Sequence, residues 1–217
     1  MVDRNPIGLR SFKVFRVWSI GGLAILVIIL HLLSGVSIAA SDLTAEQLLQ
    51  LENGEVVVAV VHTQGPSKGT VEATILIDAP ASRIWSIMLD CSQIPTFVPG
   101  VEHCEVLDSG QNWEIIRHDV KWIWFFPQIS YVFRARYQPN RQIDFVRIEG
   151  DLRDMQGRWQ LTPMPDSAKT RVCYSVYVDP GFLVPQWLVR SALKTDLPAV
   201  LTALRRKVLN SLSKQWH

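Results

Sequence analysis

The side chains of this 217-residue chain that could do chemistry do not form a recognisable catalytic motif. Its five histidines, at positions 31, 62, 103, 118 and 217, have no serine or cysteine partner at a spacing typical of nucleophilic catalysis. The sequence has no H-x-x-H or H-E-x-x-H metal motif. Asp151 and Asp154 lie in a polar turn, where we expect solvated carboxylates rather than an acid–base pair. The sequence therefore predicts no catalytic residue, no metal site and no cofactor.

His118 is the histidine best placed to meet a ligand, because it lies in the strand-like segment WEIIRHDV (113–120). Neighbouring residues of a strand point to opposite faces, so either His118 or Arg117 must face the apolar side. A buried charge is costly unless it is paired, so the residue facing a cavity would be a natural hydrogen-bond partner for a ligand. The alternative is a salt bridge on the open face of the sheet.

More charged residues lie on the next two predicted strands. Arg134 and Arg136 share a face of one strand, and Arg147 and Glu149 share a face of the next. Charge pairing across the two strands is the simplest explanation. The alternative makes Arg147 a polar group inside a ligand pocket, and Arg147 is therefore also a candidate contact.

The segment KWIWFFPQISYVF (121–133) concentrates aromatic area. In one interpretation, Trp122, Trp124 and Tyr131 line the mouth of a cavity or touch a bilayer, where such rings prefer the interface. In the other, the segment is a strand end whose alternate rings pack in the core. Trp122 and Trp124 share one face of an extended strand, so at most half of these rings face the core.

Residues 1–41 form a separate leader, in which Arg4, Arg10, Lys13 and Arg16 precede an uncharged stretch. That stretch is long enough for a membrane-spanning helix, with residues 17–40 as the membrane partner. Its apolar heart, 20–33, also suits a cleaved signal peptide, with Ser37-Ile38-Ala39 as the cleavage site. A buried core helix is the third alternative. With either an anchor or a signal, the basic end stays cytoplasmic and the rest of the chain is exported into the cell envelope.

The charge of the exported part argues against nucleic acid as a partner. The leader holds four basic residues and one acidic residue, which leaves 18 basic and 19 acidic residues in 42–217. No basic field remains to bind a phosphate backbone.

Export would also place the three cysteines in an oxidising compartment. They show no C-x-x-C motif or metal-ligand spacing. Cys91 and Cys104 bracket the short loop CSQIPTFVPGVEHC, and an oxidising compartment could close it with a disulfide. The alternative is two unrelated small apolar residues. Cys173, inside a strand pattern, is expected to be inert core filling.

The rest of the sequence predicts a short helix, a series of strands and a terminal helix. The short helix spans Ser41–Asn53, and a second helix starts at Pro80. Pro95 and Pro99 break the loop that follows. Strands are predicted at 55–62, 70–77, 105–107, 113–120, 129–137, 142–149, 155–163 and 170–178, with a turn at 108–110. The terminal helix begins at Pro185 and runs to 212, with an interruption or kink at 196–198. Strands at this spacing, without helices between them, predict an antiparallel meander.

Three segments carry a resemblance to a known family: VEATILIDAPASRIWSIMLDCSQIPTFVPG (71–100), GRWQLTPM (157–164) and TRVCYSVYVDPG (170–181). Their order resembles the START-like (SRPBCC) superfamily of polyketide cyclases and coenzyme Q-binding proteins. The resemblance implies an α+β helix-grip fold, in which an antiparallel curved sheet wraps round a long C-terminal helix. It implies a START-like domain over 70–213, preceded by a helix-and-strand extension over 42–69 and the hydrophobic leader.

The resemblance also implies an apolar cavity that binds, and carries or shelters, a lipid or quinone rather than catalysing a reaction. One alternative is a polyketide cyclase or aromatase acting in the same cavity through polar residues such as His118, Arg147 or Tyr174. The other is a non-ligand interaction module that uses the aromatic segment 121–133. The residues predicted to contact the ligand are Trp85, Phe97, His118, Trp122, Trp124, Tyr131, Arg147, Trp159, Tyr174 and Leu201.

Overall fold

The computed structural model of the chain describes residues 43–61, 70–121, 128–165, 167–181 and 184–213. Residues 43–217 form one compact unit. Among the described residues, no helix has the length and hydropathy needed to cross a membrane. The predicted leader, 1–41, lies outside the described residues.

The described part begins with the short helix α2 (Ala45–Glu52), which confirms the first predicted helix. Thr44 caps this helix, because its side chain accepts a hydrogen bond from the N–H of Gln47. The Gln47 side chain accepts one from the N–H of Thr44 in return, which completes a capping box.

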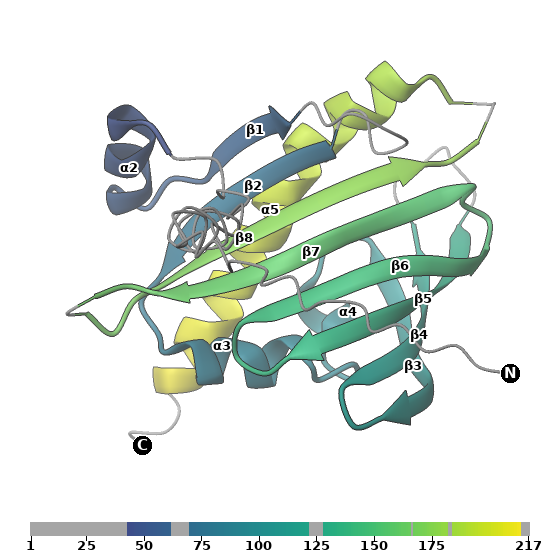
Figure 1. Cartoon of the computed structure of the whole chain (residues 1–217), viewed down its shortest axis with the longest axis horizontal. Coiled ribbons are helices and arrows are strands. Elements are labelled where there is room, and N and C mark those ends of the chain that lie inside the picture. The colour runs from purple at the N-terminus through teal and green to yellow at the C-terminus, as the bar shows by residue number, and fades with distance from the viewer. Residues whose placement is uncertain (1–42, 62–69, 122–127, 166, 182–183, 214–217) are drawn as a thin grey trace, which may run out of the picture. The chain divides into compact units, whose positions relative to one another are not determined.

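The strands of the described chain form an eight-stranded antiparallel sheet in the order β1-β2-β8-β7-β6-β5-β4-β3 (Figure 1). All these pairings join strands that are consecutive in the chain, except the pairing of β2 with β8. The strands are β1 (Val57–Val61), β2 (Thr70–Ile77), β3 (Val101–Gly110), β4 (Trp113–Val120), β5 (Ile129–Gln138), β6 (Gln142–Gly150), β7 (Asp154–Pro163) and β8 (Thr170–Asp179). The predicted meander is confirmed.

Strand β3 is longer than predicted, and the turn predicted at 108–110 is wrong. Residues 108–110 belong to the strand and pair with β4 as far as Gly110 opposite Trp113. A register shift between Val106 and Asp108 absorbs an extra residue. The composition of Asp108, Ser109 and Gly110 is typical of a turn, but their pairing with β4 makes them part of the strand.

Two short helices, α3 (Ala81–Met88) and α4 (Ile94–Phe97), connect β2 to β3. The loop expected to be broken by Pro95 and Pro99 contains α4 instead. Pro95 is compatible with this turn of helix because it lies in the first turn, where its missing N–H would have no intrahelical partner.

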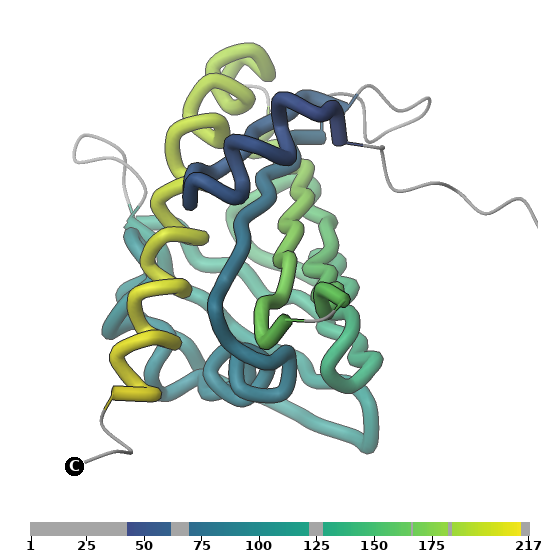
Figure 2. Tube along the Cα trace, turned by 90° about the vertical axis from the view of Figure 1, so that its left-hand side faces the viewer, coloured from purple at the N-terminus to yellow at the C-terminus, as the bar shows by residue number. Residues whose placement is uncertain are grey.

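The long helix α5 (Gln186–Ser213) runs along one side of the strands (Figure 2). Of the interruption or kink predicted at 196–198, the interruption is wrong, because α5 continues through Pro198. A proline inside a helix costs about 3 kcal/mol or more. Burial of Leu197, Leu201 and Leu204 against the sheet offsets it, at roughly 1.5–3 kcal/mol for each side chain.

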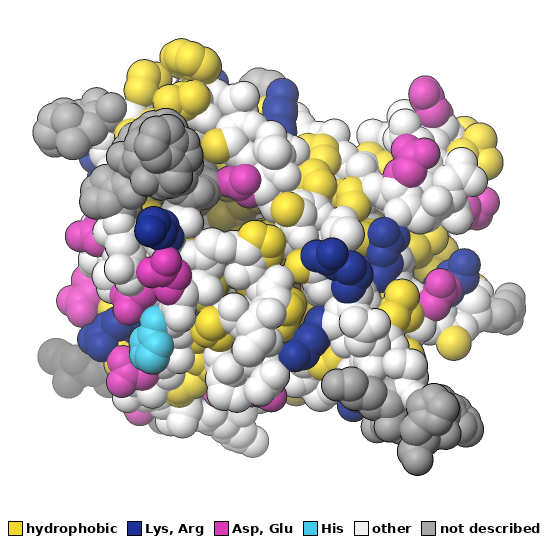
Figure 3. Space-filling model, turned by 180° about the vertical axis from the view of Figure 1, so that it is seen from behind, with side chains coloured by type: hydrophobic (Ala, Val, Ile, Leu, Met, Phe, Trp, Pro, Cys, Tyr) yellow, Lys and Arg dark blue, Asp and Glu magenta, His cyan; other side chains and the backbone are white. Residues whose placement is uncertain are grey.

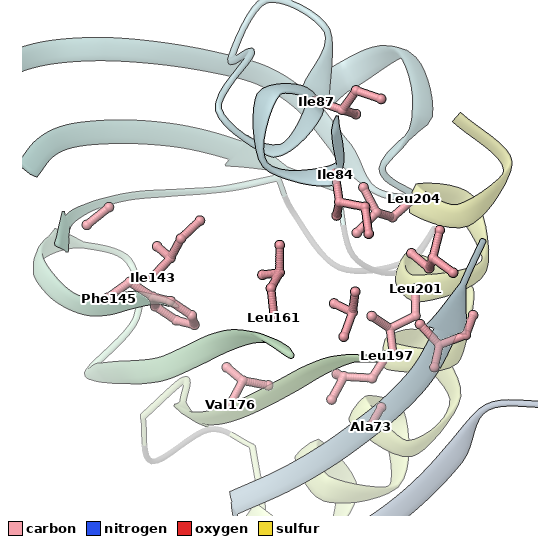
Figure 4. Close-up of a cluster of buried hydrophobic side chains, with 14 of the residues drawn as sticks. Ala73, Ile84, Ile87, Ile143, Phe145, Leu161, Val176, Leu197, Leu201 and Leu204 are labelled. Carbon is pink, nitrogen blue, oxygen red and sulfur yellow. The ribbon is translucent and has the colours of Figure 1, made fainter. Parts of the chain in front are cut away.

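The apolar stripe of α5 packs over β2 and α3 (Figure 4). Ile84 of α3 lies beside Leu204 there, while Phe145 and Leu161 project from the sheet (Figure 4). The exposed residues of α5 include Lys194 as well as the apolar Trp187 and Leu209. Seen from behind, this face of the protein mixes basic, acidic and apolar side chains, with Lys and Arg gathered near its middle (Figure 3). The predicted helix-grip fold is thus confirmed.

Candidate functional site

A cavity of about 370 Å³ lies between the curved sheet and α5. Side chains that point inward from β3–β8 line it, together with α3, α4 and the middle of α5. Its lining is mostly apolar, and the buried apolar members are Ile116, Ala135, Ile143, Phe145, Leu152, Met155, Val176, Val178, Leu193, Leu197 and Leu204. The size and the apolar lining are those of a small-molecule site.

Strand alternation explains which residues line the cavity. Every second residue of β5 faces it, from Ile129 to Tyr137, and the register places His118 of β4 directly opposite Tyr131. The same alternation places Trp159 of β7 opposite Tyr174 of β8.

Gly157 makes room for the Phe145 ring at the centre of this wall. Gly157 lies opposite Phe145 in the register of β6 and β7. A Cβ atom on Gly157 would lie 2.3 Å from Cζ of Phe145 and 2.4 Å from the carbonyl oxygen of Ser175. The phenyl ring of Phe145 therefore occupies space that a side chain at residue 157 would need.

The entrance to the cavity lies where the α4 loop, the end of β4 and the middle of α5 meet. The exposed lining residues Pro99, Lys121 and Ala199 come from these three segments. The predicted candidates Trp122 and Trp124 follow Lys121 in the chain and lie outside the described residues.

Two connections hold the α4 loop in place. Cys91 and Cys104, the predicted pair, are joined by a disulfide and both line the cavity. Nζ of Lys207 on α5 donates hydrogen bonds to Oε1 of Gln93 at 3.0 Å and Oγ1 of Thr96 at 3.3 Å. The same ammonium group lies 5.6 Å from the centre of the Phe97 ring. The loop is thus tied to both β3 and α5.

The structure brings several of the predicted contact residues to the cavity. Five of them line it: Phe97, His118, Tyr131, Trp159 and Tyr174. The rings of Trp159 and Tyr174 are stacked with centroids 3.8 Å apart, and His118 lies 5.8 Å from Tyr131.

Three other predicted contact residues do not line the cavity. Trp85 is buried on α3 with its ring edge-on to Tyr137, so Tyr137 takes the lining position instead. Leu201 is fully buried in the core, further round α5 than the lining residues Leu197 and Leu204. Arg147 turns its guanidinium to the backbone, where it donates hydrogen bonds to the carbonyl oxygens of Ile148 and Gly150. This arrangement avoids placing an unpaired charge in an apolar cavity.

Arg117 and His118 separate as alternation requires. His118 lines the cavity, and Arg117 forms a 2.8 Å ion pair with Glu105 on the outer face. The predicted salt bridge on the open face is thus confirmed for Arg117, and the ligand contact of His118 stays a prediction. Arg134 is placed differently from the predicted charge pairing, with its guanidinium 5.6 Å from the ring centre of Trp113.

Burial keeps the polar groups of the cavity uncharged. It lowers the pKa of His118 from 6.5 to about 4, an effect that the carboxylate of Asp119 partly opposes. Burial also raises the pKa of Tyr131 and Tyr174 above the ordinary value, and the nearby Tyr131 adds to the rise at Tyr174. All three side chains are therefore neutral near pH 7.

Tyr137 forms a separate polar contact at the cavity wall. Its hydroxyl donates a 2.7 Å hydrogen bond to Oε2 of Glu114, and burial together with this carboxylate raises the Tyr137 pKa. Cys173 faces away from the cavity, and burial raises its thiol pKa to about 12. Within the described residues, no group of three or more His, Cys, Asp or Glu side chains is placed to hold a metal ion.

Sequence reasoning missed the aromatic centre of the wall, Phe133 and Phe145, as well as Tyr137. Strand alternation predicts Phe133 and Tyr137 once Tyr131 is known to face the cavity, because all three lie on the same face of β5. Phe145 pairs with Ala135 of that same face.

The comparisons with known proteins agree with this geometry. The family model described as "Polyketide cyclase / dehydrase and lipid transport" matches residues 77–205, which is more than half of the chain. The chain belongs to this family. No curated protein sequence matches it.

Solved structures of the START superfamily share the fold. The Zhui aromatase/cyclase from Streptomyces sp. R1128 superposes with a TM-score of 0.59 at 20% identity, covering 66% of this chain and 94% of its own. The STAR-related lipid transfer protein from Xanthomonas axonopodis gives 0.61 at 18% identity, with 70% and 93% covered. Human STARD10 gives 0.60 at 12% identity, with 75% and 73% covered. At these identities the likeness shows the fold alone, and the family includes both lipid-transport and cyclase members.

Proposed function

We propose that this protein binds a hydrophobic small molecule of the lipid or quinone class in the cavity, and carries or shelters it on the exported side of a membrane. The observation that carries the proposal is the cavity of about 370 Å³ under α5, whose lining is mostly apolar. An apolar cavity of this size is costly to leave unfilled, because its walls lose packing contacts.

The expected affinity follows from the apolar area that a ligand would bury. A 12-carbon chain gains about 0.8 kcal/mol per methylene, or roughly 10 kcal/mol in total. Association costs about 4–15 kcal/mol in lost freedom. Apolar contact alone therefore gives modest affinity, and ordered polar contacts decide which molecule is retained.

The Cys91–Cys104 disulfide supports export, because such bonds persist in oxidising compartments and are rare in the cytosol. In this proposal, residues 17–40 either anchor the protein in the membrane or direct its export as a signal peptide. The binding domain then lies on the far side of the membrane from the basic N-terminal residues.

A cyclase or aromatase is the second candidate function, favoured by the polar groups His118 and Tyr174 inside the cavity. Arg147, the third residue considered for that chemistry, does not reach the cavity. An enzyme would lose turnover when His118 and Tyr174 are replaced by apolar residues, and a carrier would keep most of its ligand uptake. The interaction-module hypothesis predicts an interior filled by Trp side chains, whereas Trp159 lies on the wall of an open space.

The test is to identify what the protein carries. The full-length protein is purified from the membrane and envelope fractions of its host, extracted with organic solvent, and the extract is analysed by mass spectrometry. The proposal predicts one class of apolar compound, near one molecule per protein and enriched over a mock purification. An extract that matches the mock purification would contradict it.

A further inference from the structure

Three polar side chains inside the cavity have no hydrogen-bond partner in the described protein. They are His118 of β4, Tyr131 of β5 and Tyr174 of β8, named here the polar cluster. Among the described residues, Nε of Arg147 is the only polar side-chain atom that is sealed from solvent and unpaired. The polar atoms of the cluster therefore reach the open space of the cavity.

Ring packing holds the cluster in place. His118 and Tyr131 are directly opposite in the β4–β5 register, and both rings contact Phe133, at centroid distances of 5.0 and 6.0 Å. Tyr174 is stacked on Trp159 at 3.8 Å. The rings of Phe133 and Phe145 join Tyr131 to Tyr174, because the successive centroid distances are 6.0, 6.1 and 6.1 Å, so the three residues belong to one continuous wall.

The one basic residue among the described lining residues is Lys121, which is exposed at the entrance, so no positive charge is buried beside the cluster. Glu114 is bound by the hydroxyl of Tyr137, and Asp196 and Lys121 belong to the segments that meet at the entrance. An anionic head group beside the cluster would be buried without a cation, which costs several kcal/mol. An uncharged hydroxyl or carbonyl would find both donors and acceptors there.

We propose that His118, Tyr131 and Tyr174 form the polar end of the cavity, which hydrogen-bonds an uncharged oxygen group, hydroxyl or carbonyl, of an otherwise apolar ligand. This inference rests on the proposed function and specifies its ligand class. The polar cluster would favour neutral molecules that carry an oxygen. Hydrocarbons would leave the cluster without hydrogen-bond partners, and acids would bring a negative charge without a cation beside it.

The test compares three probes with the same 12-carbon chain: dodecane, 1-dodecanol and dodecanoate. The full chain in lipid nanodiscs is incubated at pH 7.5 with an equal mixture of the three probes. After gel filtration, the bound probes are quantified by mass spectrometry, and the amounts on empty nanodiscs are subtracted. The unequal partition of dodecanol and dodecane into lipid affects every protein equally, so it cancels when their ratio is compared between wild type and a variant.

The decisive variant is the double substitution Tyr131→Phe/Tyr174→Phe, which keeps both rings and removes both hydroxyls. Loss of two hydrogen bonds should lower the dodecanol-to-dodecane ratio on the order of tenfold. Tyr177→Phe is the matched control, since Tyr177 is on the same strand as Tyr174 but does not line the cavity. The control should leave the ratio within twofold of wild type.

Each outcome has one meaning. A tenfold fall in the double variant alone supports the polar cluster. A ratio that changes less than twofold, or dodecanoate bound by wild type as well as dodecanol, overturns this inference and leaves apolar binding intact. If neither dodecane nor dodecanol exceeds the empty-nanodisc level on wild type, the proposed function fails and this inference fails with it.

Discussion

The burial of His118 makes the stability of the fold depend on pH in a defined window. The cavity wall holds the imidazole neutral, with a pKa lowered from 6.5 to about 4 by burial. In the unfolded chain, the same group takes up a proton near pH 6.5. Acid therefore favours the unfolded state, and replacing His118 by leucine removes this dependence.

The size of the effect follows from the two pKa values. Between about pH 6.5 and pH 4, the unfolded chain binds the His118 proton and the folded protein does not, so the free energy of unfolding falls as the pH falls. One pKa unit corresponds to about 1.4 kcal/mol, which gives roughly 3 kcal/mol across this window. Above pH 6.5, His118 does not make the free energy of unfolding depend on pH. Below pH 4, the loss of stability due to His118 has reached its full size.

The measurement is guanidinium chloride unfolding of the full-length protein in mild detergent at several pH values from 7.5 to 4. Carboxylates also titrate in this range, so the informative quantity is the difference between wild type and His118→Leu at each pH. We expect that difference to shift by about 3 kcal/mol in favour of His118→Leu on going from pH 7 to pH 4.

Ile143→Leu is the matched control, because Ile143 lines the same cavity, does not titrate and is not one of the rings packed on His118. Its stability difference from wild type should stay constant with pH. If His118→Leu gives the same flat line, or shifts in the opposite direction, the imidazole is not held neutral by burial.

Three further predictions concern the scaffold of the cavity. Replacing both Cys91 and Cys104 by alanine should lower the free energy of unfolding by about 3 kcal/mol, as measured by denaturant unfolding, because the disulfide closes a loop across 13 positions. Gly157→Ala should destabilise the fold by about 1–3 kcal/mol in the same assay, because the added methyl meets Phe145 and the backbone. Lys207→Met should speed amide hydrogen exchange in α4 several-fold, measured by mass spectrometry, because it removes the contacts between α5 and that loop.

The controls for these predictions come from the same molecule. Wild type under reducing conditions should match the double cysteine variant, and a smaller loss in both would contradict the role of the disulfide. A Gly157→Ala variant as stable as wild type would show that Phe145 has room to move aside. Arg206→Met removes a neighbouring exposed charge on α5 and should leave exchange in α4 unchanged. Equal protection of α4 in wild type and Lys207→Met would show that Lys207 does not hold the loop.

The sheet was predictable from the sequence because each inner strand pairs on both sides and alternates in hydrophobicity. The predicted starts of β2, β4, β5, β6 and β8 match the structure. The ends of β3 and the course of α5 were not predictable from local composition. Residues 108–110 form a strand through pairing with β4, and α5 passes Pro198 because its stripe is buried on both sides of it.

The cavity was only partly predictable, because residue type does not distinguish its wall from the solid core. Leu201 and Trp85 have the composition of lining residues but pack behind it. Arg147 has the strand position of a lining residue, opposite Phe133, yet its guanidinium binds backbone carbonyls beside a register shift. Such outcomes depend on helix rotation and on a bulge, neither of which the sequence pattern determines.

The most direct test of cavity binding is photolabelling with a 12-carbon alkyl diazirine, followed by digestion and mapping of the labelled residues by mass spectrometry. If the probe binds in the cavity, labels are expected on lining residues such as Ile116, Phe145 and Tyr174. Those labels should disappear in Ala135→Phe, which fills the cavity from β5, and in the presence of the compound extracted from the native protein. Labels confined to residues 1–42 or to the outer face of the sheet, and unchanged in Ala135→Phe, would contradict binding in the cavity.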